Sequence, residues 1–198
     1  MKLSQFAFIV IFSFSNASSN EYSGNIFNQF SHFMRNKLLP HSSSQLSTQI
    51  SPTIEVGFSP NGAALPLIIK VIRSAKKSIC MAAYSFTLKN IAQELINAKE
   101  RGVLVKVVTG KVLRDFRYNV FQYLRDNLVQ VHVNTHYQIM HNKFIVVDDI
   151  TVETGSFNYS KSAVKKNAEN VIVLWNNQNV AHAYLSECER LFLEGTPY

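Results

Sequence analysis

The chain has 198 residues, of which 46% are hydrophobic and 17% charged, and its formal net charge is +7. This length suffices for one domain with a buried core, and the composition excludes an intrinsically disordered chain. The basic balance favours polyanionic partners, either nucleic acid or an anionic membrane surface, but it carries no information about chemistry.

The N-terminal stretch "MKLSQFAFIVIFSFSNASS" predicts a secretory signal peptide over residues 1–17. Lys2 supplies the positive charge, residues 6–14 the apolar core, and residues 15–17 a small-residue cleavage site. The apolar run is shorter than the roughly 20 residues that a membrane span needs. We therefore expect export to the periplasm or to the medium, with an uncleaved N-terminal membrane anchor as the alternative.

Residues 18–52 are rich in Ser, Asn and Gln, which predicts a linker. Inside it, "NIFNQFSHFMRNKLL" spaces its apolar residues as an amphipathic helix does. Such a helix can dock on a membrane or a partner, or it can pack on its own domain.

From Thr53 onward the pattern alternates between strands and helices. The predicted strands cover residues 53–59, 78–86, 103–108, 128–133, 143–148, 151–155 and 169–175. The predicted helices cover residues 62–76, 90–102, 112–126 and 178–194. Asn90 and Gln93 form an expected capping pair, and Gly102 and Gly195 end their helices. Residues 53–198 thus predict one α/β domain, with a mixed sheet between helices on both faces.

Two cysteines lie far apart in the sequence. Cys80 falls in an apolar strand and Cys188 in the last helix. We expect two buried free thiols in preference to a disulfide. Neither cysteine has the spacing of a zinc ligand set.

One stretch, "IMHNKFIVVDDITVETGSFNYS", carries the chemistry. Side chains alternate along a strand, so His141 and Lys143 share a face, roughly 7 Å apart. Lys143 is then a fixed cation for phosphoryl charge, and His141 a nucleophile or proton donor near neutral pH. Asp148 has the opposite strand parity, which predicts a structural role.

The returning strand of the hairpin adds hydrogen-bond donors. Gly155 permits close backbone approach, while Ser156 and Asn158 can donate to phosphate oxygens. Singly, each of these residues is typical of a turn. The combination with His141 and Lys143 points to a phosphate site.

The spacing of these residues resembles the HKD motif of the phospholipase D superfamily. The later "KNAEN" is similar to a segment of the small bacterial endonucleases of that superfamily, and the resemblance extends over residues 53–194. It implies a phospholipase D-like fold and a metal-independent phosphodiesterase that acts through a phosphohistidine. Thr109-Gly110 departs from the pattern where an Asp is expected, as does the hairpin tip Asp149-Ile150, which lacks a Gly.

The resemblance also implies a role for each motif residue. His141 would attack the phosphate or act as the partner acid, and Lys143, Ser156 and Asn158 would bind the phosphate. Glu169 of "KNAEN" would be the carboxylate that holds the catalytic histidine. A plain surface charge is the alternative for Glu169.

Such a reaction needs a nucleophile and a separate acid, yet only His141 has a Lys two residues on. We therefore expect a homodimer in which two copies of His141 share one site, as the family's one-motif members are built. No cofactor or metal is expected. A zinc set of His132, His136 and His141 has no natural strand arrangement, and the 13 acidic residues are too dispersed for a two-metal site.

The substrate is less constrained than the reaction. A basic stretch with interleaved aromatics contains Lys111, Arg114 and Arg117, and the motif is followed by Lys161, Lys165 and Lys166. Such surfaces suit a nucleic-acid backbone, although a solvated helix face has the same composition. The sequence favours a non-specific endonuclease. The alternatives are a phospholipase D that releases a lipid headgroup, and an inactive module that binds nucleic acid or membrane.

Overall fold

The computed structural model describes residues 51–60, 62–110 and 120–198. The predicted signal peptide and the linker with its amphipathic helix lie outside the described residues. So do Lys111, Arg114 and Arg117 of the predicted basic surface. In the part that is described, no helix is both long enough and apolar enough to cross a membrane.

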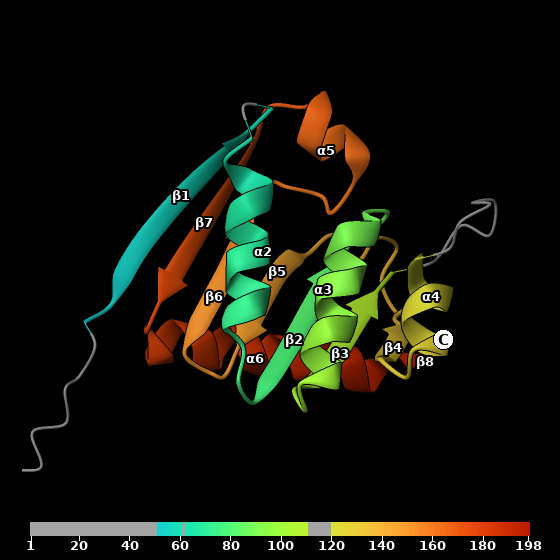
Figure 1. The fold of residues 1–198 in the computed structure, drawn as a ribbon. Helices are drawn as coiled ribbons and strands as arrows, with labels where there is room; N and C mark the ends of the chain where they lie inside the picture. Colours follow the sequence, from blue (N-terminus) through green and yellow to red (C-terminus); the bar gives the residue numbers. More distant parts are fainter. Residues whose placement is uncertain (1–50, 61, 111–119) are drawn as a thin grey trace, which may run out of the picture. The chain divides into compact units, whose positions relative to one another are not determined.

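One mixed sheet of eight strands forms the centre of the domain, in the order β1-β7-β6-β5-β2-β3-β4-β8 (Figure 1). The strands are β1 (Thr53–Ser59), β2 (Ser78–Ala83), β3 (Leu104–Thr109), β4 (Gln130–Val133), β5 (Lys143–Val147), β6 (Thr151–Gly155), β7 (Glu169–Trp175) and β8 (Thr196–Pro197). Strands β2, β3 and β4 are parallel to one another, and the other neighbours pair antiparallel.

Helices cover both faces of the sheet. They are α2 (Ala64–Ser74), α3 (Lys89–Glu100), α4 (Val120–Asp126), α5 (Lys161–Lys165) and α6 (Gln178–Glu194). Figure 1 shows α2, α3 and α4 on one face and α6 across the other. This is the α/β architecture that the sequence predicts. The five-residue α5 and the two-residue β8 were not predicted, because elements this short have no periodicity to detect.

The burial of each strand follows its place in the sheet. Central β2, "SICMAA", is buried along both faces except at Ser78, and its apolar run has no alternation. Edge strand β1 alternates instead: Gly57 and Ser59 are buried, whereas Ile54, Val56 and Phe58 are exposed. Two cores result, a larger one under α2, α3 and α4 and a smaller one under α6.

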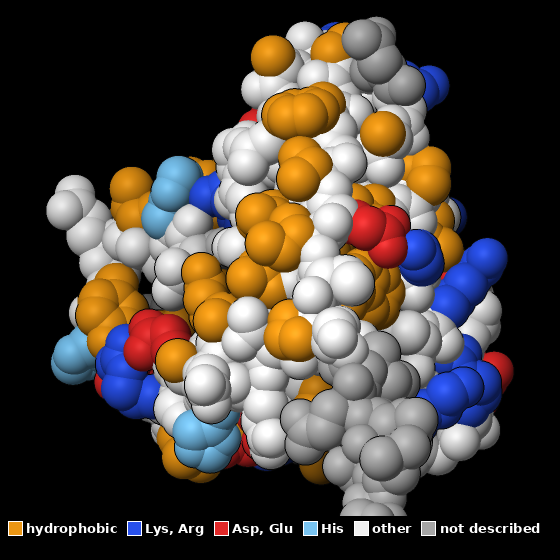
Figure 2. Space-filling view, turned by 90° about the vertical axis from the view of Figure 1, so that its left-hand side faces the viewer, with side chains coloured by type: hydrophobic (Ala, Val, Ile, Leu, Met, Phe, Trp, Pro, Cys, Tyr) orange, Lys and Arg blue, Asp and Glu red, His pale blue; other side chains and the backbone are white. Residues whose placement is uncertain are grey.

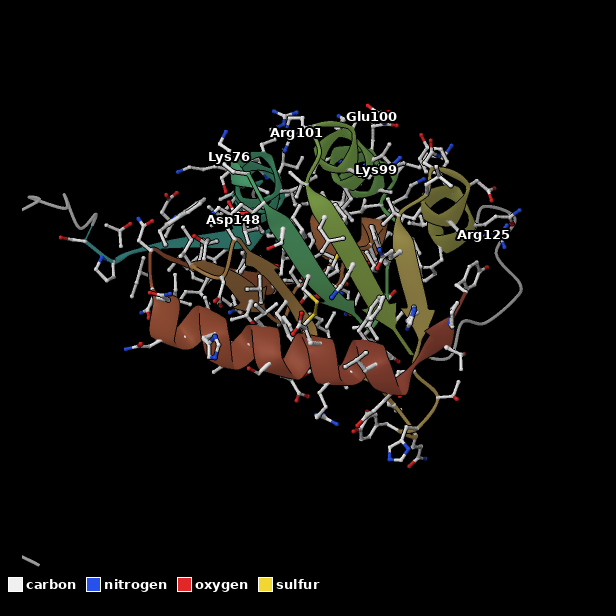
Figure 3. All side chains as sticks on the ribbon, turned by 90° about the horizontal axis from the view of Figure 1, so that it is seen from below. Lys76, Lys99, Glu100, Arg101, Arg125 and Asp148 are labelled. Atoms are coloured by element: carbon white, nitrogen blue, oxygen red, sulfur yellow. A yellow bond between two sulfur atoms is a disulfide. The ribbon has the colours of Figure 1, made fainter. Side chains whose placement is uncertain are left out.

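The β5–β6 turn forms without glycine because Asp148 and Asp149 take positive φ angles of 54° and 55°. The Asp148 carboxylate also accepts backbone N–H bonds from Lys76, Lys77 and Ser78, at 2.8, 2.7 and 2.9 Å. Figure 3 shows Asp148 beside Lys76, where the chain passes from α2 to β2. One carboxylate therefore ties this turn to the start of the central strand.

Two local predictions were wrong. Cys80 and Cys188 form a disulfide that joins β2 to α6 (Figure 3), with their Cα atoms 6.3 Å apart. The pairing arises because Cys80 faces α6 across the smaller core. Asn90 and Gln93 do not cap α3 either: Leu88 is the N-cap, without a side-chain hydrogen bond, and Gln93 pairs with Asn97.

Candidate active site

Strand pairing gathers the motif at one edge of the sheet. Lys143 starts β5 opposite Ala83, the last residue of β2, and Gly155 ends β6 beside Val171. The start of β5, the end of β6 and the end of β2 therefore meet. An open pocket of about 370 Å³ lies there, lined by His141, Asn142, Lys143, Phe144, Thr154, Gly155, Ser156, Asn158 and Tyr184.

His141 and Lys143 face each other within this pocket. The Lys143 ammonium donates to the carbonyl oxygen of His141 at 2.6 Å, and its Nζ lies 3.2 Å from Nδ1 of the imidazole. Burial lowers the pKa of Lys143, and the nearby Glu169 carboxylate acts in the opposite direction. His141 itself is exposed to solvent. The pair thus presents a cation and an accessible imidazole to one small volume.

Asn158 contributes a polar atom that has no partner. Its Oδ1 is buried and accepts no hydrogen bond from the residues that the structure describes. Leaving a buried acceptor unpaired costs about 1–3 kcal/mol. An orphaned side chain that lines the pocket is a sign of a site that is completed by a ligand.

No hydrogen bond or ion pair joins Glu169 to His141 among the described residues. One of its carboxylate oxygens accepts from the Ser156 hydroxyl at 2.6 Å, and the other from the Asn167 amide at 2.8 Å. The Ser156 hydroxyl oxygen in turn accepts the backbone N–H of Asn170 at 3.1 Å. Glu169 therefore orients Ser156 in the single chain, and its role of holding the catalytic histidine stays a prediction.

Gly155 is required by the packing of the strands. A Cβ at this position would collide with the carbonyl oxygen of Asn170 on β7. This approach brings Ser156 to Asn170, with a backbone hydrogen bond of 3.2 Å from Ser156 N to the Asn170 carbonyl. The glycine thus sets the separation of β6 and β7 at the site.

Tyr84 is a site residue that the sequence reasoning missed. It follows β2, is 42% exposed, and places its ring centroid 4.4 Å from that of His141. The Lys143 ammonium lies 5.0 Å from the same ring centroid. The backbone N–H of Tyr84 donates to the carbonyl of Asn142, the residue between His141 and Lys143. Tyr84 could have been found from the sequence only if the pairing of β2 with β5 had been known, and the order of the elements in the sequence does not give this pairing.

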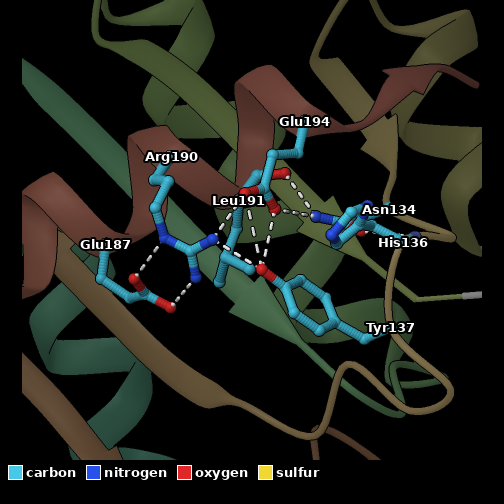
Figure 4. Close-up of polar contacts among 7 residues, drawn as sticks. All are labelled: Asn134, His136, Tyr137, Glu187, Arg190, Leu191 and Glu194. Carbon is cyan, nitrogen blue, oxygen red and sulfur yellow. Dashed lines mark hydrogen bonds and ion pairs between the residues drawn. The ribbon is translucent and has the colours of Figure 1, made fainter.

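The segment that leads to His141 is anchored on α6, as Figure 4 shows. Asn134 is fully buried and donates to the Leu191 carbonyl at 3.0 Å. The Tyr137 hydroxyl donates to the Glu194 carboxylate at 3.1 Å and accepts from Arg190 at 2.6 Å. Glu187 holds the other side of this guanidinium. His141 therefore follows a segment with several fixed points.

His132, His136 and His141 are not grouped as a metal site within the part of the chain that the structure describes. His132 stacks on the Phe192 ring, and its Nδ1 lies 2.7 Å from the Phe192 carbonyl oxygen. Over residues 51–60, 62–110 and 120–198, no three His, Cys, Asp or Glu side chains are grouped as metal ligands would be. Of the predicted basic surface, Lys161, Lys165 and Lys166 are described, and all three are exposed on or beside α5.

Comparison with known proteins gives a consistent family. A family profile described as "Cardiolipin synthase, PLD-like domain" matches residues 68–192. Phospholipase D of Rickettsia prowazekii (strain Madrid E) is 34% identical over 168 residues, which cover 84% of this chain and 80% of that protein. Mitochondrial cardiolipin hydrolase of Xenopus tropicalis is 29% identical over 135 residues, or 68% of this chain and 64% of that protein.

A solved structure agrees with this match. Nuc from Salmonella typhimurium, described as a phospholipase D family member, is 39% identical and superimposes with a TM-score of 0.73. The match covers 75% of this chain and 99% of that one. With the motif residues gathered in one pocket, these matches show that the chain belongs to the phospholipase D superfamily and is a hydrolase of phosphodiester bonds.

Proposed function

We propose that this protein is a phospholipase D, which hydrolyses the phosphodiester between a phospholipid and its headgroup through a covalent intermediate on His141. The observation that carries the proposal is the shared pocket, in which His141 and Lys143 face Ser156 and Asn158. A phosphoryl group bound there would meet a cation, a hydroxyl and an amide, with an imidazole beside them. These are the groups that nucleophilic displacement at phosphorus uses.

The reaction has two displacements. An imidazole nitrogen of His141 attacks phosphorus, a P–N bond forms, the P–O bond to the headgroup breaks, and the leaving oxygen takes a proton from a second acid. Water then attacks phosphorus, loses its proton to that same group, and the P–N bond breaks. Lys143 and the Asn158 amide would hold the phosphoryl oxygens throughout, and Ser156 would join them when its hydroxyl turns from Glu169 to the phosphate. The second acid is the part that one chain does not supply.

A second copy of the chain would supply it, as the second His141. The exposed edge of the sheet supports such a dimer. Ile54, Val56 and Phe58 of β1 are 63%, 53% and 60% exposed on the face away from α2. Figure 2 shows the hydrophobic side chains gathered on this side of the molecule. Water-exposed apolar surface of this kind favours an interface.

This apolar edge is continuous with the site. Phe58 pairs with Asn170, and Ser59 pairs with Glu169, the carboxylate that holds Ser156. A twofold contact across β1 and β7 would therefore bring two copies of the pocket toward one axis. The imidazole would then also have new acceptors available from the opposite subunit.

A lipid substrate is supported by the relatives and by the rim of the pocket. Two of the matched relatives bear the names phospholipase D and cardiolipin hydrolase. Tyr84, whose ring packs against His141, is 42% exposed, and Ile139, two residues before His141, is 56% exposed. Exposed apolar side chains at this place can contact the acyl chains of a phospholipid. The polar sugar-phosphate backbone of a nucleic acid would leave them in contact with water.

A nucleic acid is the second candidate, and the charge supports it. The net charge is +7, and Lys161, Lys165 and Lys166 are exposed on or beside α5, a few residues before Glu169. Cations beside a phosphodiesterase site can track a nucleic-acid backbone. The same residues would then make the protein a non-specific endonuclease.

We also propose that the protein is exported, as its N-terminal sequence predicts. The Cys80–Cys188 disulfide supports this location, since such bonds persist in oxidising compartments and are rare in the cytosol.

One experiment separates the two substrates. The purified protein is incubated in excess EDTA with phosphatidylcholine vesicles and, in parallel, with plasmid DNA, and His141→Ala serves as the control. Choline release that persists in EDTA and disappears in the variant supports the phospholipase. DNA cleavage with intact lipid would transfer the proposal to the nuclease. Absence of both reactions would contradict the proposed activity.

A further inference from the structure

The residues that follow β6 alternate between the pocket and the core. Ser156 and Asn158 line the pocket, whereas Phe157 and Tyr159 are 1% and 0% exposed. Residues 156–160, here called the phosphate loop, thus present polar side chains outward and aromatic ones inward. The position of the phosphate loop therefore depends on the core contacts of Phe157 and Tyr159.

Tyr159 is held at both ends. Its hydroxyl donates to the Glu153 carboxyl on β6 at 2.8 Å, and its carbonyl oxygen accepts the backbone N–H groups of Thr87 and Leu88 at 2.8 and 3.1 Å. Its ring packs edge-on against Phe86, with centroids 5.9 Å apart. The phosphate loop is therefore tied to β6 by a side chain and to the connection between β2 and α3 by its backbone.

Glu153 is an unusual residue for this position. It is 1% exposed and pairs across the sheet with Ile145 and Val173. Burial raises its pKa to about 8, which the bond from Tyr159 only partly offsets. The charged residues of α2, the helix above, are at the surface: Lys70 pairs with Glu55, and Arg73 with Glu94. Tyr159 is thus the titratable group that faces Glu153 among the described residues.

A buried carboxyl destabilises a core that an apolar residue would fill. The Glu153 carboxyl, however, accepts a directional hydrogen bond, which fixes the depth and orientation of one side chain. Here that side chain is the one next to Asn158. We propose that the buried Tyr159–Glu153 pair positions the phosphate loop, so that substrate affinity depends on the protonation state of this pair.

The consequence for pH follows from the burial. A protonated Glu153 is tolerated in the core, but an ionised one has no cation near it among the described residues and draws in water. The hydrogen bond from Tyr159 favours the ionised carboxyl, so the disturbance comes from the water that enters beside it. This water displaces Tyr159 from its buried position, and Ser156 and Asn158 lose their alignment. The inference rests on the proposed phosphodiesterase activity, and it adds two positioning residues that do not touch the substrate.

The test uses bis(p-nitrophenyl) phosphate, a soluble phosphodiester, with KM and kcat measured from pH 6 to 9.5. In Tyr159→Phe we expect KM to rise about tenfold with kcat nearly unchanged, because one buried hydrogen bond is lost and its acceptor is left unpaired. Glu153→Gln keeps an acceptor that does not titrate. Its KM should match the wild type at pH 7 and should lack the increase that the wild type shows above pH 8. Tyr123→Phe, which removes a surface hydrogen bond to Gln93, is the matched control.

A double variant separates positioning from stability. Tyr159→Phe/Glu153→Leu removes both polar partners, which can leave stability nearly unchanged. Its KM should remain raised. A double variant with wild-type KM, or a Glu153→Gln profile that overlays the wild type, would overturn the proposal.

A second readout does not need activity. Glu153 has its folded-state pKa raised to about 8 from 4.5, so the native state holds this proton while the unfolded chain has released it. Stability is then highest below pH 4.5 as far as this group is concerned, and it falls as pH rises toward 8. Over that window the unfolding constant of the wild type should increase about tenfold per pH unit more than that of Glu153→Gln. If the substrate is not hydrolysed but the two proteins differ in the pH dependence of unfolding, the proposed function is wrong, whereas the titration of buried Glu153 is supported. Equal pH dependence would contradict the titration of Glu153.

Discussion

The Tyr84 ring lies 4.4 Å from the imidazole of His141 and 5.0 Å from the Lys143 ammonium, so one aromatic side chain contacts both reactive groups. The contact is tilted rather than stacked, at 55° between the ring planes. It limits the orientations that an otherwise exposed imidazole can adopt. We therefore expect Tyr84 to act on the reaction by orienting His141.

We predict that Tyr84→Ala lowers kcat/KM for a phosphodiester by about tenfold, since aromatic and cation–π contacts are each worth about 1 kcal/mol. Tyr84→Phe keeps the ring and should retain nearly full activity. Steady-state kinetics on the three proteins tests this. An inactive Tyr84→Phe would show instead that the hydroxyl takes part in the chemistry.

The exposed edge of β1 gives a prediction about assembly. Val56→Lys/Phe58→Lys places two cations in the proposed interface, so the protein should become monomeric. It should also lose about 100-fold or more in activity, because the second His141 is absent. Analytical ultracentrifugation and the activity assay measure the two effects.

Leu128→Lys is the matched control for this change, because Leu128 is 76% exposed and lies near the opposite edge of the sheet. It should remain dimeric and active. A monomeric variant with full activity would contradict the proposal that two subunits share one active site.

Asp148 should matter for stability and not for the site. Its carboxylate accepts three backbone N–H groups at the opposite end of β5 from His141. Asp148→Ala leaves these donors unpaired and should lower the free energy of unfolding by about 2–3 kcal/mol, with KM unchanged. Urea denaturation checks this, with the exposed Asp126→Ala as the control. A rise in KM without loss of stability would place Asp148 in the site.

The disulfide should stabilise the fold without taking part in the reaction. It closes a segment with a sequence separation of 108 residues, for which chain entropy predicts about 5 kcal/mol. Cys80→Ala/Cys188→Ala should therefore have a clearly lower Tm and should keep its activity at low temperature. A Tm equal to that of the wild type under oxidising conditions would show that the bond contributes nothing.

The local parts of the site were readable from the sequence. Gly155 marks where two strands approach closely, and Asp148 was assigned a structural role, although it lies in the turn after β5 and not on the strand itself. Contacts between distant elements were not readable. Tyr84 reaches His141 only because β2 pairs with β5, and Cys80 reaches Cys188 only because α6 crosses that part of the sheet. Glu169 was predicted to hold His141, but the same-chain geometry gives its carboxylate to Ser156 and Asn167.

The proposed covalent intermediate on His141 can be tested by measuring how it is partitioned between two products. The wild-type protein is given substrates with different leaving groups, in EDTA and with ethanol present. Substrates that differ only in the leaving group form the same phosphohistidine intermediate. Ethanol and water then compete for this intermediate, so the ratio of ethyl ester to free phosphomonoester should be the same for every substrate. His141→Ala should give neither product. A ratio that changes with the leaving group, or activity that survives in His141→Ala, would contradict the central claim.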